Sequence, residues 1–189
     1  MPLSGTRLGL RDIEPLVVDD NPQSTELLGA ILMGFGISRP TKCHSVEAAR
    51  EALITRRFDL VMVNCEMAEE DGFALVREMR ADRQGPNACT PVLMLSASTP
   101  ESKVVRARDC GANFTIAKPV SPMILLERML WIAQSRRVFI DTPRYQGPDR
   151  RFRTEPLATG ISERRAEDLR ITAVPDRALS QDEIDGLFT

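Results

Sequence analysis

The sequence of 189 residues is short of several residue types, and these shortages limit both the possible functions and the kind of core. Its only histidine is His44, which argues against a histidine-based metal site and against a nucleophile activated by histidine. Aromatic residues make up 5% of the chain, so we expect a mostly aliphatic core. The cysteines stand singly, without a C-x-x-C pair, which predicts reduced, buried thiols and a cytoplasmic protein; they are Cys43, Cys65, Cys89 and Cys110.

A long apolar run is also absent. No stretch of about 18 or more apolar residues occurs, so we expect no membrane insertion. The first residues, Met1-Pro-Leu-Ser-Gly-Thr-Arg, lack the apolar centre of a signal peptide. The net charge of −2 provides no global field that attracts nucleic acid, and DNA is not an expected partner.

Apolar stretches of strand length alternate with amphipathic stretches of helical length along the first two thirds of the chain. The predicted strands are 16–18, 41–44, 60–63, 91–95 and 114–117, and the predicted helices are 22–35, 46–56, 72–80, 100–110 and 122–136. Thr99 precedes Pro100 and is expected to cap the fourth helix. The alternation predicts an α/β fold, in which helices cover both faces of a five-stranded parallel sheet.

Polar residues stand at the carboxyl ends of four predicted strands. Asp19 and Asp20 follow the first strand, Asn64 the third, Ser96 the fourth and Lys118 the fifth. In an open α/β sheet this edge is where ligands bind. The five side chains are therefore the candidate pocket of the domain.

In order and spacing, these residues resemble the receiver domain of response regulators over about residues 14–135. The resemblance implies a flavodoxin-like, doubly wound sheet of the CheY type. It implies that Asp19 and Asp20 match the acidic pair that holds Mg²⁺, and that Ser96 and Lys118 match the residues that contact a phosphoryl group. Lys118-Pro119 matches a peptide bond that is usually cis.

Two positions depart from the receiver pattern. Asn64 stands where receivers carry the aspartate that accepts the phosphoryl group, and Ala68 replaces a proline commonly found four residues later. An amide is a poor nucleophile, and one of the three carboxylates that hold Mg²⁺ is lost. We therefore expect neither catalysis nor phosphorylation and no catalytic cofactor, with weak Mg²⁺ binding at Asp19 and Asp20 as the remaining metal option. The pocket is expected to persist as a hydrogen-bond network in which Lys118 pairs with an aspartate.

The C-terminal part of the chain uses arginine as its only strong base. No lysine follows Lys118, whereas ten arginines lie between residue 136 and the C-terminus. They alternate with aromatic and acidic residues, and Gly147-Pro148 predicts a turn. Arginine reads guanine N7 and O6 with two hydrogen bonds and stacks on bases, while a carboxylate accepts from guanine N1 and N2. The segment thus suits a guanine dinucleotide; a charge-balanced linker is the alternative, because six acids lie between residues 136 and 170.

This segment also resembles a family of second-messenger effectors. A CheY-like receiver followed by an arginine-rich segment with Tyr145-Gln-Gly-Pro-Asp-Arg-Arg is similar to the CheY-like cyclic di-GMP effectors of the Cle family. The resemblance implies that cyclic di-GMP binds the tail, as one molecule or as a stacked dimer, and that the protein acts on flagellar motors or surface attachment. The implied ligand residues are Arg136, Arg137, Tyr145, Asp149, Arg150, Arg151, Arg153, Arg164, Arg165 and Asp168.

The last residues resemble a segment of another motor protein. Leu179-Ser-Gln-Asp-Glu-Ile-Asp-Gly-Leu-Phe is similar to the N-terminal segment of FliM, the flagellar switch protein, which docks on CheY. Ser180 and Glu183 form a capping-box pattern. The apolar face offered to a groove comprises Leu179, Ile184, Leu187 and Phe188. The implied partners are a flagellar switch or other motor protein, CheY, or the protein's own receiver; the alternative is an ordinary terminal helix that packs on its own domain.

These patterns divide the chain into an extension (1–13), a receiver (14–135), an arginine-rich ligand segment (136–172) and a C-terminal helical region (173–189). We expect a largely disordered tail that orders around its ligand, because it is too polar to form a core alone. The predicted function is a non-catalytic, phosphorylation-independent adaptor that senses cyclic di-GMP in the cytoplasm and is recruited to the flagellar motor or cell pole. The alternative is a degenerate receiver that acts only as a protein–protein interaction module.

Overall fold

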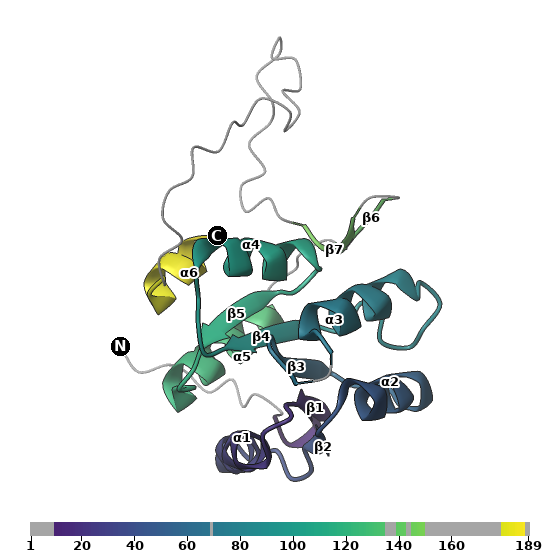
Figure 1. Ribbon diagram of the computed structural model, residues 1–189. Coiled ribbons are helices and arrows are strands. Elements are labelled where there is room, and N and C mark those ends of the chain that lie inside the picture. Colours follow the sequence, from purple (N-terminus) through teal and green to yellow (C-terminus); the bar gives the residue numbers. More distant parts are fainter. Residues whose placement is uncertain (1–9, 69, 135–138, 143–144, 150–178, 188–189) are drawn as a thin grey trace.

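The centre of the molecule is a parallel sheet of five strands in the order β2-β1-β3-β4-β5 (Figure 1). The structure is a computed structural model that describes residues 10–68, 70–134, 139–142, 145–149 and 179–187. The strands of the sheet are β1 (Pro15–Val18), β2 (Thr41–Cys43), β3 (Leu60–Asn64), β4 (Val92–Ser96) and β5 (Phe114–Ala117). The predicted flavodoxin-like, doubly wound sheet is confirmed.

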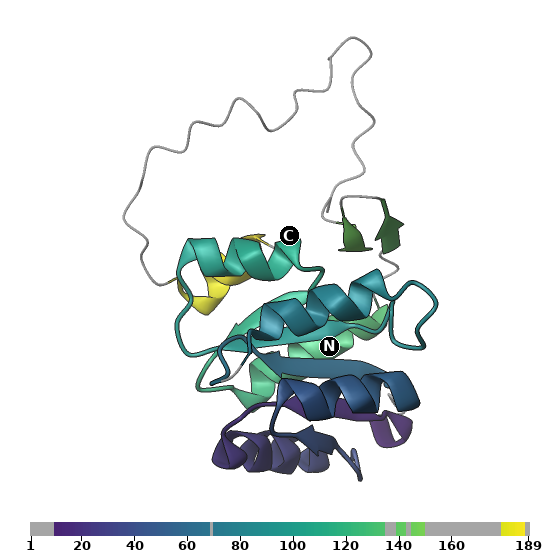
Figure 2. The same ribbon diagram turned by 45° about the vertical axis from the view of Figure 1, so that its right-hand side comes forward.

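Helices connect the strands and cover both faces of this sheet. α1 and α5 lie on one face, and α2, α3 and α4 lie on the other (Figures 1 and 2). The helices are α1 (Pro22–Gly34), α2 (Val46–Thr55), α3 (Gly72–Ala81), α4 (Glu101–Asp109) and α5 (Pro122–Gln134), and a short 3-10 helix, η1 (Leu10–Asp12), precedes β1. Because both faces are covered, every residue of β1, β3 and β4 is buried.

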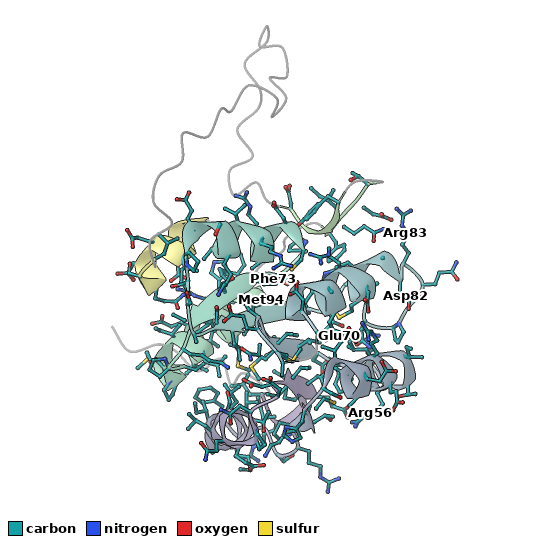
Figure 3. The ribbon with its side chains drawn as sticks, viewed as in Figure 1. Arg56, Glu70, Phe73, Asp82, Arg83 and Met94 are labelled. Atoms are coloured by element: carbon teal, nitrogen blue, oxygen red, sulfur yellow. The ribbon has the colours of Figure 1, made fainter. Side chains whose placement is uncertain are left out.

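The core between the layers is mostly aliphatic, as the low aromatic content predicts. Leucine, valine, isoleucine and methionine dominate it, together with the buried rings of Phe58, Phe73 and Phe114. The side chains in Figure 3 show Phe73 of α3 and Met94 of β4 within this packed region. No helix in the described ranges is long and apolar enough to cross a membrane.

The cysteines differ in one respect from the expectation of buried thiols. Cys89 is exposed in the loop before β4, whereas Cys43, Cys65 and Cys110 are free and buried as predicted. In that loop the buried places belong to Asn87 and Thr90, which satisfy backbone groups next to them: the Asn87 amide donates to the carbonyl of Leu53, and the Thr90 hydroxyl to that of Phe58. These polar side chains occupy the interior because the carbonyls of Leu53 in α2 and of Phe58 before β3 need their hydrogen bonds.

The described parts of the tail form regular structure that the sequence did not indicate in full. β6 (Phe139–Asp141) and β7 (Gln146–Pro148) pair as an antiparallel hairpin, and α6 (Gln181–Leu187) forms the C-terminal helix. The predicted turn at Gly147-Pro148 is wrong, because both residues belong to β7. The chain instead reverses between Thr142 and Tyr145, where the Thr142 N–H donates to the Tyr145 carbonyl at 2.9 Å. The expectation of a largely disordered tail otherwise concerns residues outside the described ranges.

α4 lies between these two parts of the tail. In both ribbon views α6 flanks one end of α4 and the hairpin flanks the other (Figures 1 and 2). The start of α4 also corrects a prediction: Thr99 does not cap the helix, since Pro100 is the cap residue and makes no side-chain cap hydrogen bond. The Thr99 hydroxyl donates instead to the carbonyl of Leu179 at 2.7 Å, so a residue expected to begin a helix holds the C-terminal segment.

Candidate functional site

Asp19 is the buried centre of the pocket at the carboxyl edge of the sheet. Its side chain is fully buried, and Lys118 Nζ lies 2.6 Å from its Oδ2. The Ser24 hydroxyl donates to the same oxygen at 2.6 Å, and the Asn21 N–H donates to Oδ1 at 3.0 Å. Both oxygens of Asp19 thus accept hydrogen bonds from protein donors. The Lys118–Pro119 peptide bond after β5 is cis, as the receiver pattern implied.

Asn64 joins the two sides of this pocket through the two ends of its amide. Its Oδ1 accepts from Lys118 Nζ at 3.0 Å, while its Nδ2 donates to the carbonyl of Glu66 and lies 3.4 Å from Asp20 Oδ1. An aspartate here would direct a second carboxylate at Asp20, and the two charges would need a cation between them. The amide removes that need because it offers a donor to one neighbour and an acceptor to the other.

Ala68 supplies a second donor to Asp20. The Ala68 N–H donates to Asp20 Oδ2 at 2.7 Å. A proline at this position has no N–H and could not form this bond. Both departures from the receiver pattern, Asn64 and Ala68, therefore direct N–H groups at the same carboxylate. This relation joins residues 20, 64 and 68, and only the folded chain brings them together.

This arrangement does not fit the Mg²⁺ that receivers bind. The oxygens of Asp19 are occupied by protein donors, Asp20 accepts from two N–H groups, and the third carboxylate is an amide. Mg²⁺ demands hard oxygen ligands in near-octahedral geometry. The carboxylate oxygens engaged in these hydrogen bonds do not provide that set of ligands. Within the described residues, no cluster of three histidine, cysteine, aspartate or glutamate side chains could hold a metal.

The neighbouring Ser96 hydroxyl and Cys65 thiol do not provide another nucleophile that could accept a phosphoryl group at this edge. The buried Ser96 hydroxyl donates to the carbonyl of Ser98 at 2.5 Å. Burial raises the pKa of the Cys65 thiol to about 12, and its hydrogen bond with Ser96 opposes this only in part. The thiol therefore stays protonated at neutral pH and is a poor nucleophile.

We predict that Asn64→Asp lowers the free energy of unfolding by about 1–3 kcal/mol in the absence of divalent metal, because Asp20 loses a donor and gains a like charge. Added Mg²⁺ should restore part of that stability by binding the new carboxylate pair. Urea denaturation of the wild type and the variant, each with EDTA and with Mg²⁺, measures both effects. The Asn64→Ala variant is the matched control, since it loses the donor without gaining a charge and should not respond to Mg²⁺. Equal stabilisation of the wild type and Asn64→Asp by Mg²⁺ would contradict the account.

A buried arginine connects the receiver to the hairpin. Arg80 of α3 is 2% exposed and donates to the carbonyls of Ala88, Thr90 and Gly111 at 2.7, 2.8 and 3.1 Å. Its guanidinium carbon lies 5.0 Å from the ring centre of Phe139 in β6, within the range of cation–π attraction. Burial lowers the pKa of Arg80 to about 10, which leaves the guanidinium charged at neutral pH. The charge is thus held by carbonyl dipoles and one aromatic face.

Two glycines allow β7 to approach the receiver closely. A Cβ on Gly147 would lie 2.8 Å from the Cα of Gly111 and 2.5 Å from the hydroxyl of Tyr145. Gly111, after α4, has φ +94° and faces the carbonyl of Gln146. The Tyr145 hydroxyl donates to the carbonyl of Pro148 at 2.8 Å and fixes its ring along the hairpin. The hairpin therefore packs by backbone contact, which requires the absence of side chains on both sides.

The described part of the chain contains only two of the predicted ligand residues. Tyr145 lies just before β7 and Asp149 just after it, and both are partly buried. The remaining eight lie outside the described residues: Arg136, Arg137, Arg150, Arg151, Arg153, Arg164, Arg165 and Asp168. The ligand segment thus continues directly from a hairpin that is fixed to α3 and to the end of α4.

We predict that Gly147→Ala detaches the hairpin, because the added methyl group meets the backbone of Gly111. The amide signals of Gly111 and Gln146 should shift in two-dimensional NMR spectra, while those of β1 and β3 stay in place. Gly34→Ala is the control, since a Cβ there meets nothing within 4 Å. An unchanged spectrum around Gly111 would show that the close approach does not hold the hairpin.

The C-terminal helix docks on the receiver at β5, the edge strand of the sheet. The Gln181 side chain accepts from the N–H of Ala117 at 2.9 Å and donates to the carbonyl of Thr115 at 3.1 Å, so one amide satisfies two backbone groups of the open edge. Ile184 is completely buried against the domain. The Leu179 N–H donates to the carbonyl of Thr99 at 2.6 Å.

Of the predicted partner-binding residues, Leu179 and Ile184 thus contact the protein's own receiver. Phe188 and the side chain of Leu187 lie outside the described part of the chain. The capping box is formed: the Ser180 N–H donates to Glu183 Oε2 at 2.9 Å, and the Glu183 N–H donates to Ser180 Oγ at 3.4 Å. The C-terminal segment therefore packs on the receiver of its own chain in this structure, which is the arrangement of an ordinary terminal helix.

Partly buried charges oppose the apolar contact of α6. Asp185 forms an ion pair with Arg128 of α5. Burial raises the pKa of Asp185, although Gln181 and Arg128 each lower it. The ion pair thus compensates only part of the desolvation that the carboxylate suffers on docking. Arg128 Nε is itself buried without a hydrogen-bond partner. The desolvation of the Asp185 carboxylate and of Arg128 Nε therefore makes the docking of α6 weaker than the burial of Ile184 alone would make it.

We predict that Ile184→Ala accelerates hydrogen exchange of the Ala117 amide more than about tenfold, because the variant loses buried apolar contact and α6 dissociates more often. Gly186→Ala is the opposing variant: a Cβ there meets nothing within 4 Å, and alanine favours a helix by about 1 kcal/mol over glycine, so exchange should slow. Exchange followed residue by residue tests both. Equal rates in all three proteins would show that α6 does not protect β5.

The fold and the pocket together define a signalling module of the receiver type: acidic residues, a hydroxyl and a lysine meet at the carboxyl edge of a doubly wound sheet. Residues 16–130 match the family model of the response regulator receiver domain. The chain therefore belongs to the response regulator receiver family, whose domain covers more than half of its length.

Proteins from several signalling systems share this domain. The transcriptional regulatory protein GltR of Pseudomonas aeruginosa is 33% identical over 114 residues, which cover 60% of this chain and 46% of GltR. The chain thus spans less than half the length of that relative. The chemotaxis protein CheY of the same organism is 25% identical over 114 residues, which cover 60% of this chain and 90% of CheY.

Solved structures agree with the fold. The chemotaxis response regulator CheY4 of Vibrio cholerae superimposes with a TM-score of 0.58 at 25% identity, covering 64% of this chain and 98% of that one. A response regulator from Chloroflexus aurantiacus gives a TM-score of 0.60 at 27% identity, covering 65% and 98%. These similarities concern the receiver and leave the arginine-rich tail to be explained by its own residues.

Proposed function

We propose that this protein is a phosphorylation-independent signalling adaptor that binds cyclic di-GMP through its arginine-rich tail. The observation that carries the proposal is the fixed start of that tail. Tyr145 and Asp149 belong to a segment that packs against α3 and the end of α4, and Arg150 and Arg151 follow directly in the sequence. A guanine ligand needs stacking groups, bidentate donors and carboxylate acceptors, and this short stretch contains all three.

The degenerate pocket supports a signal that does not use phosphorylation. Asn64 offers no carboxylate for a phosphoryl group, and Lys118 is already bound to Asp19 and Asn64. The usual input of a receiver is thus replaced by internal hydrogen bonds. A second messenger that binds elsewhere on the chain supplies the input in this proposal, and the receiver serves as a scaffold with no catalytic function.

The two attachments of the tail suggest how binding is transmitted. The hairpin is held beside Gly111, after α4, and α6 is held through Thr99, before α4. The predicted ligand residues from Arg150 to Asp168 lie in sequence between these attachments. A ligand that favours one arrangement of the connecting segment changes the equilibrium between docked and released α6. Released α6 then exposes both its own apolar face and the edge of β5.

The partner in this proposal is a protein of the flagellar motor. The FliM-like sequence of α6 already covers a receiver surface in cis, so a motor protein with a similar segment would compete with α6 for β5. Alternatively, released α6 binds the receiver of CheY. Both routes place the protein in the cytoplasm at the motor or cell pole, where it affects motility or surface attachment.

Calorimetric titration of the full chain with cyclic di-GMP tests the proposal. We expect saturable binding that GTP and single-stranded RNA do not reproduce. Arg150→Ala and Arg151→Ala should each weaken the affinity about tenfold or more, because each removes charge-assisted hydrogen bonds. Arg57→Ala is the matched control, since Arg57 is an exposed arginine of the receiver outside the tail.

The same titration separates the proposal from its main alternative. A degenerate receiver that acts only through protein–protein contacts would give no heat with cyclic di-GMP and would bind its partner equally well with and without the nucleotide. Binding that is equal for cyclic di-GMP, GTP and RNA would indicate a general polyanion site and would also contradict the proposal.

A further inference from the structure

A pocket of about 330 Å³ lies between the hairpin and the receiver, beside the first residues of the predicted ligand segment. Three arginines of α3 and the residues after it line it on the receiver side, and Thr142, Tyr145 and Gln146 line it on the hairpin side. Its size lies near the lower limit of small-molecule sites, which span ~300–1,000 Å³. Figure 3 shows Arg83 projecting beside the hairpin, where the hairpin meets the receiver.

The three arginines differ in the partners that they have. Arg77 is exposed and makes no hydrogen bond or ion pair with the described residues. Arg80 is buried, forms no ion pair within the same ranges, and its Nη2 has no hydrogen-bond partner. Arg83 pairs with Asp141 of β6 at 3.1 Å, and both side chains are more than half exposed. The wall therefore carries more positive charge than the nearby carboxylates neutralise.

A buried guanidinium without a carboxylate partner is costly, and an anion next to it recovers part of that cost. The burial of Arg80 is reflected in the lowered pKa of its guanidinium. Asp109 also lines the pocket and Asp141 pairs with Arg83, so two acids stand beside three bases. The pocket thus has the charge of a site for an anion with one negative charge, such as a phosphate diester.

We propose that this pocket binds a phosphate of the guanine dinucleotide and that Arg77 of the receiver is a ligand residue. The inference rests on the proposed function and extends it, because the nucleotide site is then shared between the receiver and the tail. Arg77 supplies the free planar donor, and Arg83 becomes a second donor when it leaves Asp141. Tyr145, fixed by its bond to Pro148, forms the side of the pocket from which the ligand segment continues.

Sharing the site explains why the hairpin is attached to the receiver. The backbone contact at Gly111, which fixes one end of the tail in the proposed function, also holds the hairpin against the arginines of the receiver. Contact with α3 brings Arg77 and Arg83 to the start of the arginine-rich segment, so that part of the site is formed before ligand arrives. The receiver would thus act as one half of the sensor in addition to its role as a docking surface.

Two substitutions of opposite expected sign test the inference by calorimetric titration of the full chain with cyclic di-GMP. Arg77→Ala should weaken binding about tenfold, because a charge-assisted donor is lost. Asp141→Asn should strengthen binding about threefold, because it releases Arg83 and the Gln146 side chain, which both contact Asp141. A merely structural disturbance of the hairpin would weaken binding in both variants. Arg57→Ala, which removes an exposed arginine elsewhere on the receiver, should have no effect.

The outcomes separate this inference from the function on which it rests. Wild-type binding that is weakened by Arg150→Ala but unchanged by Arg77→Ala would overturn the shared site and retain the tail as the sensor. Absence of wild-type binding would overturn both. Weaker binding in Arg77→Ala together with tighter binding in Asp141→Asn would support the pocket. Titration with linear pGpG and with pyrophosphate identifies the chemistry: a dependence on Arg77 should persist for both if the pocket recognises phosphate.

Discussion

The interaction on which this structure depends is the contact of one amide with two opposite charges. Asn64 presents its oxygen to Lys118 and its nitrogen to the side of Asp20, so it occupies a place where a carboxylate would need a cation. Ala68 contributes a backbone N–H to the same aspartate. The carboxyl edge of the sheet is thereby satisfied by protein groups. These internal hydrogen bonds and the Lys118–Asp19 ion pair hold the loops around the edge.

The hydrogen-bonded pocket at the carboxyl edge of the sheet is connected to α4 through the loop after β3. Glu66, whose carbonyl accepts from Asn64, forms an ion pair with Lys103 of α4 at 2.6 Å. Arg106, one turn further along α4, pairs with Asp71 and lies over the ring of Phe73 at 4.4 Å. α4 is thus held to the pocket on its inner side, while the tail is attached before and after it. In the proposed function, this helix is the most direct route from the tail to the receiver surface.

The receiver fold is shared with transcriptional regulators and with chemotaxis proteins, so it does not select a function by itself. What distinguishes this chain is where its additional residues attach. α6 occupies the open edge of β5 with a side-chain amide in place of a strand, and the hairpin contributes one wall of an arginine-lined pocket. Both attachments thus use the receiver as a docking surface.

The sequence by itself determined the receiver fold, because alternating apolar periods and polar strand ends are local features that a parallel sheet must satisfy. It also indicated an asparagine, Asn64, at the end of the third strand and the capping box of α6. It did not indicate the hairpin, since the turn signal of Gly147-Pro148 was outweighed by backbone packing on Gly111. Nor did it indicate the hydrogen bonds of Ala68 and Gln181, whose partners Asp20 and Thr115 lie 48 and 66 residues away in the sequence. Tertiary structure alone decided these contacts, because a loop N–H or a side-chain amide acquires its role only from the group that folding places opposite it.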